Sequence, residues 1–547
     1  MNTPKAIAVV LFMIMMAVQP LAAKDKSDKK TVKQLKEDIS YLASDELEGR
    51  RTGSAGEQKA VDFIIARYQK LGIKAYEKDY RHSFAFVNGK EILPATFIRV
   101  AGSTVNNRDE AFPAPFSATN KKVKGEVIPG VYEQGNIWMI PLFADKDEAE
   151  DAHFDWEKFT FERAKDAAKQ GAIAVLFYDS YGAKFPPEFL PKSEYESLDI
   201  PVAILTNKGY ESYIRRTDNN VVLEMNIALK KIEMTGTNVA AFIDNGAKYT
   251  VVLGAHLDHL GYGEDGNSLN AKKDRQIHNG ADDNASGTAA LMQLAGWIKD
   301  AKLKKYNYLF LHFSGEELGL LGSKAIVKDA ALDSNKIAYM INMDMLGRLN
   351  DSTHALTVGG VGTSPVWGTV IDKKDSRFRI SFDSAGVGPS DHTSFYHHGV
   401  PVLFFFTGLH TDYHKPSDDA DKINYKGEAM VMNYIYNVVT KMEKLPRPAF
   451  TTTKQSTVGK VRFKVTLGIM PDYSYQEGGV KVDGVTEGKP AIAAGVKAGD
   501  IILQLGEYKI NGMQSYMEAL GKFAAGDKTQ VTIKRDGKEM KLPIEFK

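Results

Sequence analysis

Beyond about residue 236, short and almost uninterrupted apolar runs alternate with longer segments that have a helical pattern. The runs expected to be strands are NVAAFI, YTVVLGA, YNYLFLHFS, IAYMINMDM, LTVGG and VPVLFFFTG. The segments expected to be helices are TAALMQLAGWIKDA, ELGLLGSKAIVKDA, PVWGTVIDKKDS and EAMVMNYIYNVVTKMEKL. Strands that are apolar on both faces and separated by helices are typical of a parallel sheet covered on both sides. We therefore expect an α/β domain with a mostly parallel mixed sheet flanked by helices.

A helical pattern also marks residues 31–72. Apolar residues recur there with the spacing of a buried helical stripe: Leu35, Ile39 and Leu42, then Ala60, Phe63, Ile64, Tyr68 and Leu71. The polar loop Glu48–Glu57 separates the two stretches. We expect two helices that belong to the same α/β domain, which then comprises residues 24–115 and 231–445.

Between these two parts, residues 116–230 have a different pattern. Short β-rich runs (GEVIPGVY, NIWMIPL, AIAVLFYD and PVAILT) alternate with one charged helical stretch, DWEKFTFERAKDAAKQ. The segment contains no concentrated metal-ligand motif and interrupts the path from the N-terminal helices to the later strands. We therefore predict a β-rich inserted domain.

The C-terminal part has its own organisation. A stretch rich in Pro, Thr and Lys follows Leu445 and indicates a linker at residues 446–458. Residues 459–547 are β-rich with one or two helical stretches. They are expected to form a separate small domain.

The first 23 residues have the pattern of a signal peptide. Lys5 supplies a positive charge, Ala6–Val18 an apolar stretch, and Leu21–Ala23 a small-residue cleavage site before KDKSDKK. The apolar stretch is short for a membrane span, which needs about 20 residues. We expect an exported protein, periplasmic or secreted, without a stable membrane span after cleavage. An uncleaved signal-anchor is the alternative.

Composition narrows the classes of function. A chain of 547 residues is too long for one core and predicts two to four domains. The 70 Lys and Arg residues nearly balance the 69 Asp and Glu residues, so nothing indicates a nucleic-acid partner. The absence of cysteine excludes disulfides, thiolate zinc sites and a cysteine nucleophile. Neither a GxSxG nucleophile elbow nor an HExxH zinc helix is present.

Histidines and acidic residues gather where the strands end. Ten of the twelve histidines lie between His256 and His414. His256, the pair Glu316 and Glu317, and Asp344 all follow predicted strands, and His414 lies in the loop after VPVLFFFTG. Parallel sheets bind ligands beyond the carboxyl ends of their strands. Imidazole and carboxylate donors delivered to one edge predict a hydrolytic metal site.

The motif GAHLDHLG places Asp258 two residues after His256, where it could hydrogen-bond the second ring nitrogen and fix the ligating tautomer. A histidine after a strand can equally be structural. Asp282 and Asp283 precede a clear helix, where the alternative is helix capping. Two successive aspartates exceed what capping requires, and a carboxylate between two cations is what a dinuclear site needs.

Glu316 and Glu317 end a buried strand with adjacent like charges, which is costly unless a cation compensates them. One carboxylate of such a pair can bind a metal while its neighbour takes a proton from water. Asp344 is another acid at an apolar strand end, and pairing with Arg348 is the structural alternative.

The loop LHTDYHKPSDD contains two candidate ligands, His414 and His410, which spacing alone does not separate. The phenol of Tyr413 could stabilise a developing oxyanion.

The motif order GAHLDHLG, NGADDNASG, GEELGLLGS, NMDMLGR, SDHTSF and YHKPSDD closely resembles the co-catalytic zinc aminopeptidases of the M28 peptidase family. The resemblance covers roughly residues 31–115 and 231–445 and implies a zinc-exopeptidase-like fold with two Zn²⁺ ions. Manganese or cobalt could occupy such a site. The metal ligands that it implies are His256, Asp283, Glu317, Asp344 and His414.

The resemblance also implies individual roles. Asp283 matches the aspartate that bridges the two ions, with His256 and Asp344 on one ion and Glu317 and His414 on the other. The catalytic residues that it implies are Glu316 as general base, Tyr413 as the oxyanion tyrosine and Asp258 as the partner of His256. A cis peptide is expected between Asp282 and Asp283, and Asp391 and His392 match a motif near the site without an assigned role.

The insert more loosely resembles a protease-associated domain, which in related peptidases can sit over the cleft. The C-terminal segment resembles a PDZ domain, with VTLGIM (465–470) as its carboxylate-binding loop, and a peptide C-terminus is a candidate partner. The predicted function is that of an exported zinc aminopeptidase acting on peptide substrates. The alternatives are a single-zinc glutaminyl-cyclase-like enzyme, a carboxypeptidase on the same scaffold, and a non-catalytic descendant of a peptidase.

Overall fold

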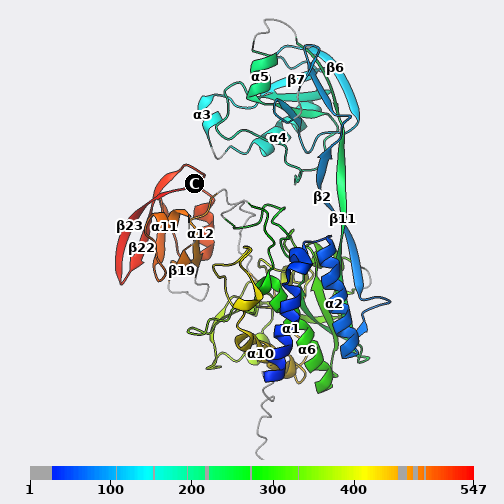
Figure 1. Ribbon diagram of the computed structural model, residues 1–547, viewed down its shortest axis with the longest axis vertical. Helices are drawn as coiled ribbons and strands as arrows, with labels where there is room; N and C mark the ends of the chain where they lie inside the picture. The colour runs from blue at the N-terminus through cyan, green and yellow to red at the C-terminus, as the bar shows by residue number, and fades with distance from the viewer. Residues whose placement is uncertain are drawn as a thin grey trace, which may run out of the picture.

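The computed structural model describes residues 28–546 except 106–107, 152–153, 194, 216–220, 271–273, 330–331, 454–464, 472–477 and 486–487. Figure 1 shows the α/β domain at the bottom, the inserted domain at the top and the C-terminal domain beside them. The predicted signal peptide lies outside the described residues. No helix within the described ranges is both long enough and apolar enough to cross a bilayer.

A nine-stranded mixed sheet forms the α/β domain, as the alternation of strands and helices predicts. Its order is β1 (Lys74–Ala75), β11 (Leu229–Ile243), β13 (Asn307–Phe313), β12 (Thr250–His256), β14 (Ile337–Met343), β17 (Val402–Phe406), β15 (Ala355–Gly359) and β16 (Arg379–Phe382), and β2 (Arg81–Ile92) also pairs with β11. Strands β13, β12, β14 and β17 pair in parallel, whereas β11–β13 and β15–β17 pair antiparallel. Parallel pairing is therefore concentrated in the centre of the sheet.

Helices cover both faces of this sheet. One face is covered by α1 (Lys29–Leu42), α2 (Ala55–Leu71), α6 (Gly287–Ala301) and α10 (Tyr425–Met442), whose buried side chains share one core with strand residues. The other face is covered by the short α7 (Leu321–Ile326) and α9 (His392–Tyr396). Strands β12, β13 and β14 contribute to both cores, which explains their uninterrupted apolar sequences.

Local signals set the limits of the helices. Ser54 caps α2 by accepting a hydrogen bond from the Glu57 backbone N–H, and Gly72 ends the helix in the left-handed region at φ 62°. The expected helix at 317–330 begins only at Leu321, because Gly319 and Leu320 both have positive φ. Glu316 and Glu317 consequently lie on a turn. The expected helix at 365–376 is a single turn, α8 (Trp367–Val370), which ends where Ile371 becomes extended.

Two four-stranded sheets make up the inserted domain. The first has the order β4 (Ser103–Thr104), β3 (Phe97–Val100), β10 (Val221–Ile227) and β6 (Lys121–Val127), and the second β5 (Ala111–Pro113), β9 (Val202–Leu205), β8 (Ala174–Tyr178) and β7 (Ile137–Pro141). The sheets share one core, and α4 (Trp156–Lys169) packs on the other face of the second. The remaining helices are α3 (Lys146–Glu150) and α5 (Asn207–Tyr213).

The insert begins earlier than the predicted boundary at residue 116. Strands β3, β4 and β5 occupy residues 97–113, and they pair with β10 and β9 of the insert. Sequence pattern did not separate them because short strands of the two domains look alike. A long antiparallel ribbon of β2 and β11 connects the insert to the α/β sheet (Figure 1).

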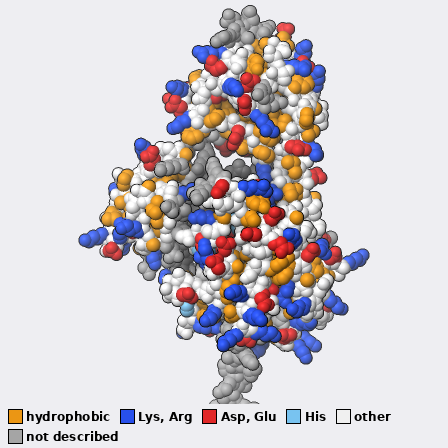
Figure 2. All heavy atoms as spheres, viewed as in Figure 1, with side chains coloured by type: hydrophobic (Ala, Val, Ile, Leu, Met, Phe, Trp, Pro, Cys, Tyr) orange, Lys and Arg blue, Asp and Glu red, His pale blue; other side chains and the backbone are white. Residues whose placement is uncertain are grey.

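The C-terminal domain has a six-stranded sheet and its own core. Its strands are β18 (Ile469–Pro471), β19 (Val480–Val485), β20 (Ile501–Leu505), β21 (Tyr508–Lys509), β22 (Lys528–Arg535) and β23 (Lys538–Glu545), with helices α11 (Pro490–Ala493) and α12 (Met513–Leu520). The start of the predicted linker lies along the α/β domain, because the Thr451 N–H donates to the Thr363 carbonyl. Basic and acidic side chains are interspersed over the face shown in Figure 2, as the balanced composition suggests.

Strand β13 buries a neutral histidine against α2. The Nε2 atom of the fully buried His312 lies 2.8 Å from the Tyr68 hydroxyl, and burial lowers the pKa of His312 to about 3. The unfolded chain binds a proton at this position below its ordinary pKa of about 6.5, but the folded chain does not. This stabilising contribution is therefore present above pH ~6.5 and falls by about 1.4 kcal/mol per pH unit as the pH drops towards 3.

We expect His312→Phe to remove this dependence. Urea unfolding of chelator-treated protein measures the free energy of unfolding at each pH. Between pH 6 and 5 this free energy should fall less steeply for the variant than for the wild type, because about one proton fewer is taken up on unfolding. The pH dependence of the free energy of unfolding above pH 7.5 provides the internal control, because His312 is neutral there in both the folded and the unfolded chain. Equal slopes in the acidic range would contradict the assignment.

Candidate metal centre

Adjacent strands deliver the candidate ligands to one edge of the sheet. His256 is the last residue of β12, Glu316 and Glu317 follow β13, and Asp344 follows β14. These strands and β17, which precedes the loop carrying His414, are neighbours and run parallel. The structure therefore brings together residues that are up to 158 positions apart in the chain, from 256 to 414.

Asp283 enters the centre from the turn that precedes α6. This turn, Ala281–Ser286, contains non-helical backbone at Asp283 and Asn284. The backbone N–H groups of Asp282 and Asp283 both donate to Asp418 Oδ2, at 3.0 and 3.1 Å. The cis peptide bond joins Asp283 to Asn284, so the expected position between Asp282 and Asp283 is wrong by one residue. Asn284 is the residue held in place on the far side of that bond, since its side chain donates to Met343 O and accepts from Met345 N–H.

The two carboxylate oxygens of Asp283 face two different sets of side chains. Oδ1 lies 3.3 Å from His256 Nε2, which is also 3.3 Å from Asp344 Oδ1. Oδ2 lies 3.2 Å from His414 Nε2, which is also 3.2 Å from Glu317 Oε2. The five side chains expected to bind metal thus form two groups that share Asp283. All are largely buried, with side-chain exposures of 1% for His256, 5% for Asp283, 6% for Glu317, 13% for Asp344 and 14% for His414.

These separations fit metal ligands. Two donor atoms on one tetrahedral zinc, each about 2.0–2.1 Å from the ion, lie about 3.3–3.4 Å apart. The nitrogen–oxygen separations around Asp283 are 3.2–3.3 Å. Imidazole nitrogens and carboxylate oxygens are also the donors that zinc, manganese and cobalt accept. Each group could therefore hold one divalent cation, with Asp283 between the two.

Contacts at the second ring nitrogen orient both imidazoles. His414 Nδ1 lies 2.9 Å from the Asn267 carbonyl and donates its hydrogen to it. In this tautomer Nε2 carries no hydrogen and can bind a cation. His256 Nδ1 lies 3.2 Å from the backbone carbonyl of Asp258 and 3.7 Å from its carboxylate. The nearer partner of His256 is thus the main-chain carbonyl of Asp258, and the carboxylate that the sequence suggests lies within ion-pair distance on the same side of the ring.

The carboxylate of Asp258 instead organises the surrounding loops. Oδ2 accepts a hydrogen bond from the Thr52 hydroxyl at 3.0 Å, and Oδ1 accepts from the Glu316 backbone N–H at 3.2 Å. Asp258 is fully buried. It therefore connects the loop before α2 to the turn that presents the two glutamates.

Electrostatics favour proton sharing within this cluster when no cation is bound. Burial lowers the pKa of His256, but Asp344 and Glu316 raise it more, and the net shift is well upward. Glu317 and Asp283 likewise raise the pKa of His414 against the effect of burial. A cation must displace these protons from the ring nitrogens, so metal affinity is expected to fall as the pH decreases.

Burial shifts the protonation of both Glu316 and Tyr413. Burial raises the pKa of the Glu316 carboxyl well above its usual range, and Asp344 adds to this shift while His256 opposes it. Burial also raises the pKa of Tyr413, which keeps its hydroxyl a hydrogen-bond donor. The Tyr413 ring stacks on His414 with a centroid distance of 3.9 Å.

The structural alternatives left open by spacing are resolved by geometry. Arg348 pairs with Asp412 at 3.2 Å, which leaves Asp344 facing His256. His410 Nε2 lies 3.2 Å from Asp282 Oδ2, whereas His414 Nε2 faces the oxygens of Asp283 and Glu317. His414 is therefore the histidine of this loop that lies in the centre.

His259 is a site residue that sequence reasoning missed, although it lies within GAHLDHLG. Its fully buried ring places Nδ1 2.7 Å from Glu317 Oε1 and 3.9 Å from Asp283 Oδ2. The 2.7 Å separation is a hydrogen-bond length and too short for two donors on one tetrahedral ion. His259, Asp283 and Glu317 lie close enough to share one ion, but the 2.7 Å separation fits a hydrogen bond better, which holds Oε1 of Glu317 and leaves Oε2 for a cation next to His414.

We expect His259→Phe to weaken the second cation site by about 10–100-fold and to spare the first, because orienting partners of metal ligands contribute about that much. Stepwise zinc titration of chelator-treated protein by calorimetry measures both affinities. His259→Gln, which can still donate to Glu317, should recover part of the loss. An equal loss at both sites would contradict the role.

Arg50 is a second residue that the sequence did not single out. It is 1% exposed and donates to the carbonyls of Leu257 and Gly280, both at 2.9 Å, and to that of Asn279 at 2.6 Å. Burial lowers its pKa to about 10, against opposing carboxylates that include Asp258. Arg50 therefore joins the loop after β12 to the loop that carries Asp283. A lone arginine in a polar loop has no sequence signal that distinguishes it from a surface residue.

Asp391 and His392 lie behind the centre. Asp391 is fully buried, and burial raises its pKa to about 7, with His256 acting in the opposite direction. His392 stacks on Phe404 at a centroid distance of 4.6 Å, and burial lowers its pKa to about 3. Asp391 thus interacts electrostatically with the centre, but neither residue is among the groups that face Asp283.

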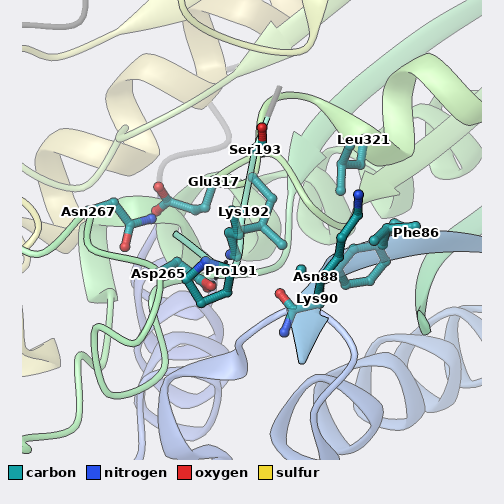
Figure 3. Close-up of a pocket in the computed structure, with 13 residues that line it drawn as sticks. Phe86, Asn88, Lys90, Pro191, Lys192, Ser193, Asp265, Asn267, Glu317 and Leu321 are labelled. Carbon is teal, nitrogen blue, oxygen red and sulfur yellow. Dashed lines mark hydrogen bonds and ion pairs between the residues drawn. The ribbon is translucent and has the colours of Figure 1, made fainter. Parts of the chain in front are cut away.

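A cleft of about 430 Å³ opens beside Glu317. Figure 3 shows Glu317 and Asn267 on one side of this cavity and Phe86 and Leu321 on the other. The insert segment 191–193 also lines it. Lys192 forms an ion pair with Asp265, which in turn binds Arg51 at 2.7 Å. The insert is thereby attached to the wall of the cleft.

Comparisons with known proteins agree with these features. Residues 238–439 match peptidase family M28, and residues 462–546 match the PDZ domain. The chain is 25% identical over 305 residues to aminopeptidase YwaD of Bacillus subtilis (strain 168), covering 52% of this chain and 61% of that protein. It is 32% identical over 176 residues to a probable leucine aminopeptidase of Arthroderma otae, covering 30% of this chain and 45% of that protein. The chain thus spans less than two thirds of the length of these relatives.

Two solved structures align over most of their length. The aminopeptidase from Aneurinibacillus sp. strain AM-1 aligns with a TM-score of 0.44 at 20% identity, covering 77% of this chain and 95% of that one. The structure of BSAP, a zinc aminopeptidase from Bacillus subtilis, aligns with a TM-score of 0.42 at 21% identity, covering 77% and 97%. From the sequence matches we conclude that this chain carries a domain of peptidase family M28 followed by a PDZ domain.

Proposed function

We propose that this protein is an exported aminopeptidase that removes N-terminal residues from peptides with the help of two zinc ions. The observation that carries the proposal is the division of the Asp283 carboxylate between two donor sets, each at 3.2–3.3 Å. A single-zinc enzyme of the glutaminyl-cyclase type needs no carboxylate shared in this way. The names of the sequence relatives, which are aminopeptidases, support the reaction class.

The donor chemistry supports zinc first, with manganese or cobalt as alternatives. Two cations held by His256, Asp344, Asp283, Glu317 and His414 would supply Lewis acidity and lower the pKa of water at the centre. The remaining chemistry comes from protein groups.

Glu316 is proposed to accept the proton of the attacking water and to pass it to the leaving amine. Its backbone N–H donates to Asp258, which fixes the turn after β13 that presents the side chain. Tyr413 is proposed to donate its hydroxyl hydrogen to the developing oxyanion. The acid–base work and the oxyanion contact thus come from two different loops at the same sheet edge.

The cleft beside Glu317 is proposed to hold the first residues of the peptide. The insert contributes residues 191–193 to it, which supports a role for this protease-associated-like domain in restricting access. We propose the organisation predicted from the sequence, with a signal peptide at 1–23, the peptidase domain, its insert, a linker and a PDZ-like domain. The paired strands of the insert run from Phe97 to Ile227.

Hydrolysis of leucine p-nitroanilide by the full mature chain tests the proposal. We expect turnover that a chelator abolishes and two equivalents of zinc restore, and no turnover of the N-acetylated substrate, which lacks the free α-amino group. Full activity with one zinc per chain would favour the cyclase-like alternative. Cleavage of the acetylated substrate at a similar rate would exclude an aminopeptidase.

A further inference from the structure

The loop 261–270, which follows β12, is attached to the inserted domain at Asp265. The Asp265 side chain is 6% exposed and accepts two hydrogen bonds from Arg51, from Nε to Oδ2 at 2.7 Å and from Nη2 to Oδ1 at 2.8 Å. Lys192 of the insert also donates to Oδ1. Burial raises the pKa of Asp265, but Arg51 and Lys192 lower it more, so the carboxylate stays charged. One buried carboxylate therefore joins the loop before α2, the insert and the loop after β12.

The same loop holds His414 at two atoms. The Asn267 carbonyl accepts from His414 Nδ1 at 2.9 Å, and the Leu269 N–H donates to the His414 carbonyl at 2.9 Å. His414 has φ 54°, a left-handed backbone conformation that residues other than glycine seldom adopt. Such a conformation persists only where surrounding contacts support it. These two hydrogen bonds, from residues two and four positions after Asp265, supply that support.

The stretch between these contacts is a closed turn. Gly266, with φ 77°, donates its N–H to the Gly263 carbonyl at 3.2 Å. Further along, the Ser268 hydroxyl lies 2.7 Å from Nε2 of the buried His278. Only Gly266 separates Asp265 from the residue whose carbonyl orients the His414 ring. A shift of the Asp265 carboxylate is therefore expected to move that carbonyl.

The insert segment that carries Lys192 is itself fixed. The Lys90 N–H of strand β2 donates to the Pro191 carbonyl at 2.9 Å. Arg51 Nη2 donates to Asn88 Oδ1 of the same strand at 2.9 Å. Figure 3 shows Lys192 and Asp265 lining the cleft together with Asn267 and Glu317. The position of the insert is thus linked to the cleft wall next to the second donor set.

We propose that Asp265, held by Arg51 and by Lys192 of the insert, positions His414 for the second cation. The inserted domain thereby contributes to the affinity of that site, and the inference rests on the two-cation centre of the proposed function. Asp265 and Lys192 are positioning residues, because neither belongs to the two donor sets that share Asp283. The first site should not depend on them, since its other donors lie at the ends of β12 and β14, outside this loop.

Stepwise zinc titration of the chelator-treated full chain by calorimetry measures both cation sites without turnover. We expect Asp265→Asn to weaken the second site about tenfold and to leave the first unchanged, at the lower end of the effect typical of groups that orient metal ligands. Lys192→Gln should weaken the second site by about threefold, because its ammonium group is 43% exposed and Arg51 still holds the carboxylate.

Two further variants separate positioning from a general effect on the insert. Lys192→Arg keeps the positive charge beside Asp265 and should retain the wild-type affinity of the second site. Lys165→Gln is the matched control, because Lys165 pairs with Glu196 at 3.4 Å within the insert and is 44% exposed, close to the 43% of Lys192. Its zinc affinities should equal those of the wild type.

Unchanged affinity of the second site in Lys192→Gln, or an equal loss at both sites, would overturn the proposal. Lys192→Gln decides the question even if Asp265→Asn fails to fold. Failure of the proposed function is seen separately. A chain that is not an aminopeptidase would lack leucine p-nitroanilide hydrolysis while its zinc affinities stay measurable, and a wild-type chain that binds one zinc would overturn both the two-cation centre and this inference before any variant is compared.

Discussion

Glu316→Gln is expected to retain two bound zinc ions and to lose about 10³-fold in kcat, within the range typical of a general base. The substitution keeps the size of the side chain and the backbone N–H that donates to Asp258. It removes the only function proposed for this side chain, the uptake and release of a proton. The two donor sets that share Asp283 do not include Glu316, so the cation sites should persist.

The neighbouring residue gives a matched comparison. Glu317→Gln should lose the second cation, because Glu317 Oε2 lies 3.2 Å from His414 Nε2 and forms part of that donor set. Metal content by atomic absorption and kcat on leucine p-nitroanilide, measured on both variants, separate the two roles. Loss of metal in Glu316→Gln, or near-normal turnover, would contradict the role of Glu316 as the general base.

Asp283→Ala is expected to reduce bound zinc from two ions to fewer than one and to abolish measurable hydrolysis. Asp283 is the residue that belongs to both donor sets, so each set would keep only an imidazole and one carboxylate. A stable catalytic zinc site generally has three protein ligands. Both sites should therefore weaken together, in contrast to the single-site effect expected for His259→Phe.

Asp282→Asn is the control for this prediction. The Asp282 carboxylate accepts from the Gly347 N–H at 2.6 Å and the Ser286 hydroxyl at 3.0 Å, and does not contact the donor sets. Its substitution should lower the free energy of unfolding by about 1–3 kcal/mol while zinc content stays at two. Retention of both ions by Asp283→Ala would contradict the assignment of Asp283 as the bridging residue. Loss of both ions in Asp282→Asn would assign the bridging role to Asp282 instead.

Much of the candidate centre was predictable because each candidate ligand occurs in a recognisable local sequence context. An acid or imidazole directly after an apolar strand is conspicuous, and parallel strands end at one edge of the sheet. His256 at the end of β12 and the glutamates after β13 follow this rule. The choice of His414 over His410 did not follow from the sequence, because both lie in one loop and only their directions differ.

Backbone detail was less predictable. The cis bond lies one residue later than expected because neighbouring acidic residues look alike in sequence. The insert starts earlier than expected because β3 to β5 are recognised only by the strands with which they pair. The helix after Glu317 is shortened by the left-handed backbone at Gly319 and Leu320, and leucine gives no sign of that conformation.

The sequence by itself determined the class of the sheet, the set of candidate metal donors and the presence of separate domains, because apolar periodicity and residue chemistry are local properties. Tertiary structure alone decided how the Asp283 oxygens divide between two donor sets, which contacts orient the imidazoles, and that His259 and Arg50 belong to the centre. These features depend on distances between segments far apart in the chain, which arise only when the segments pack together.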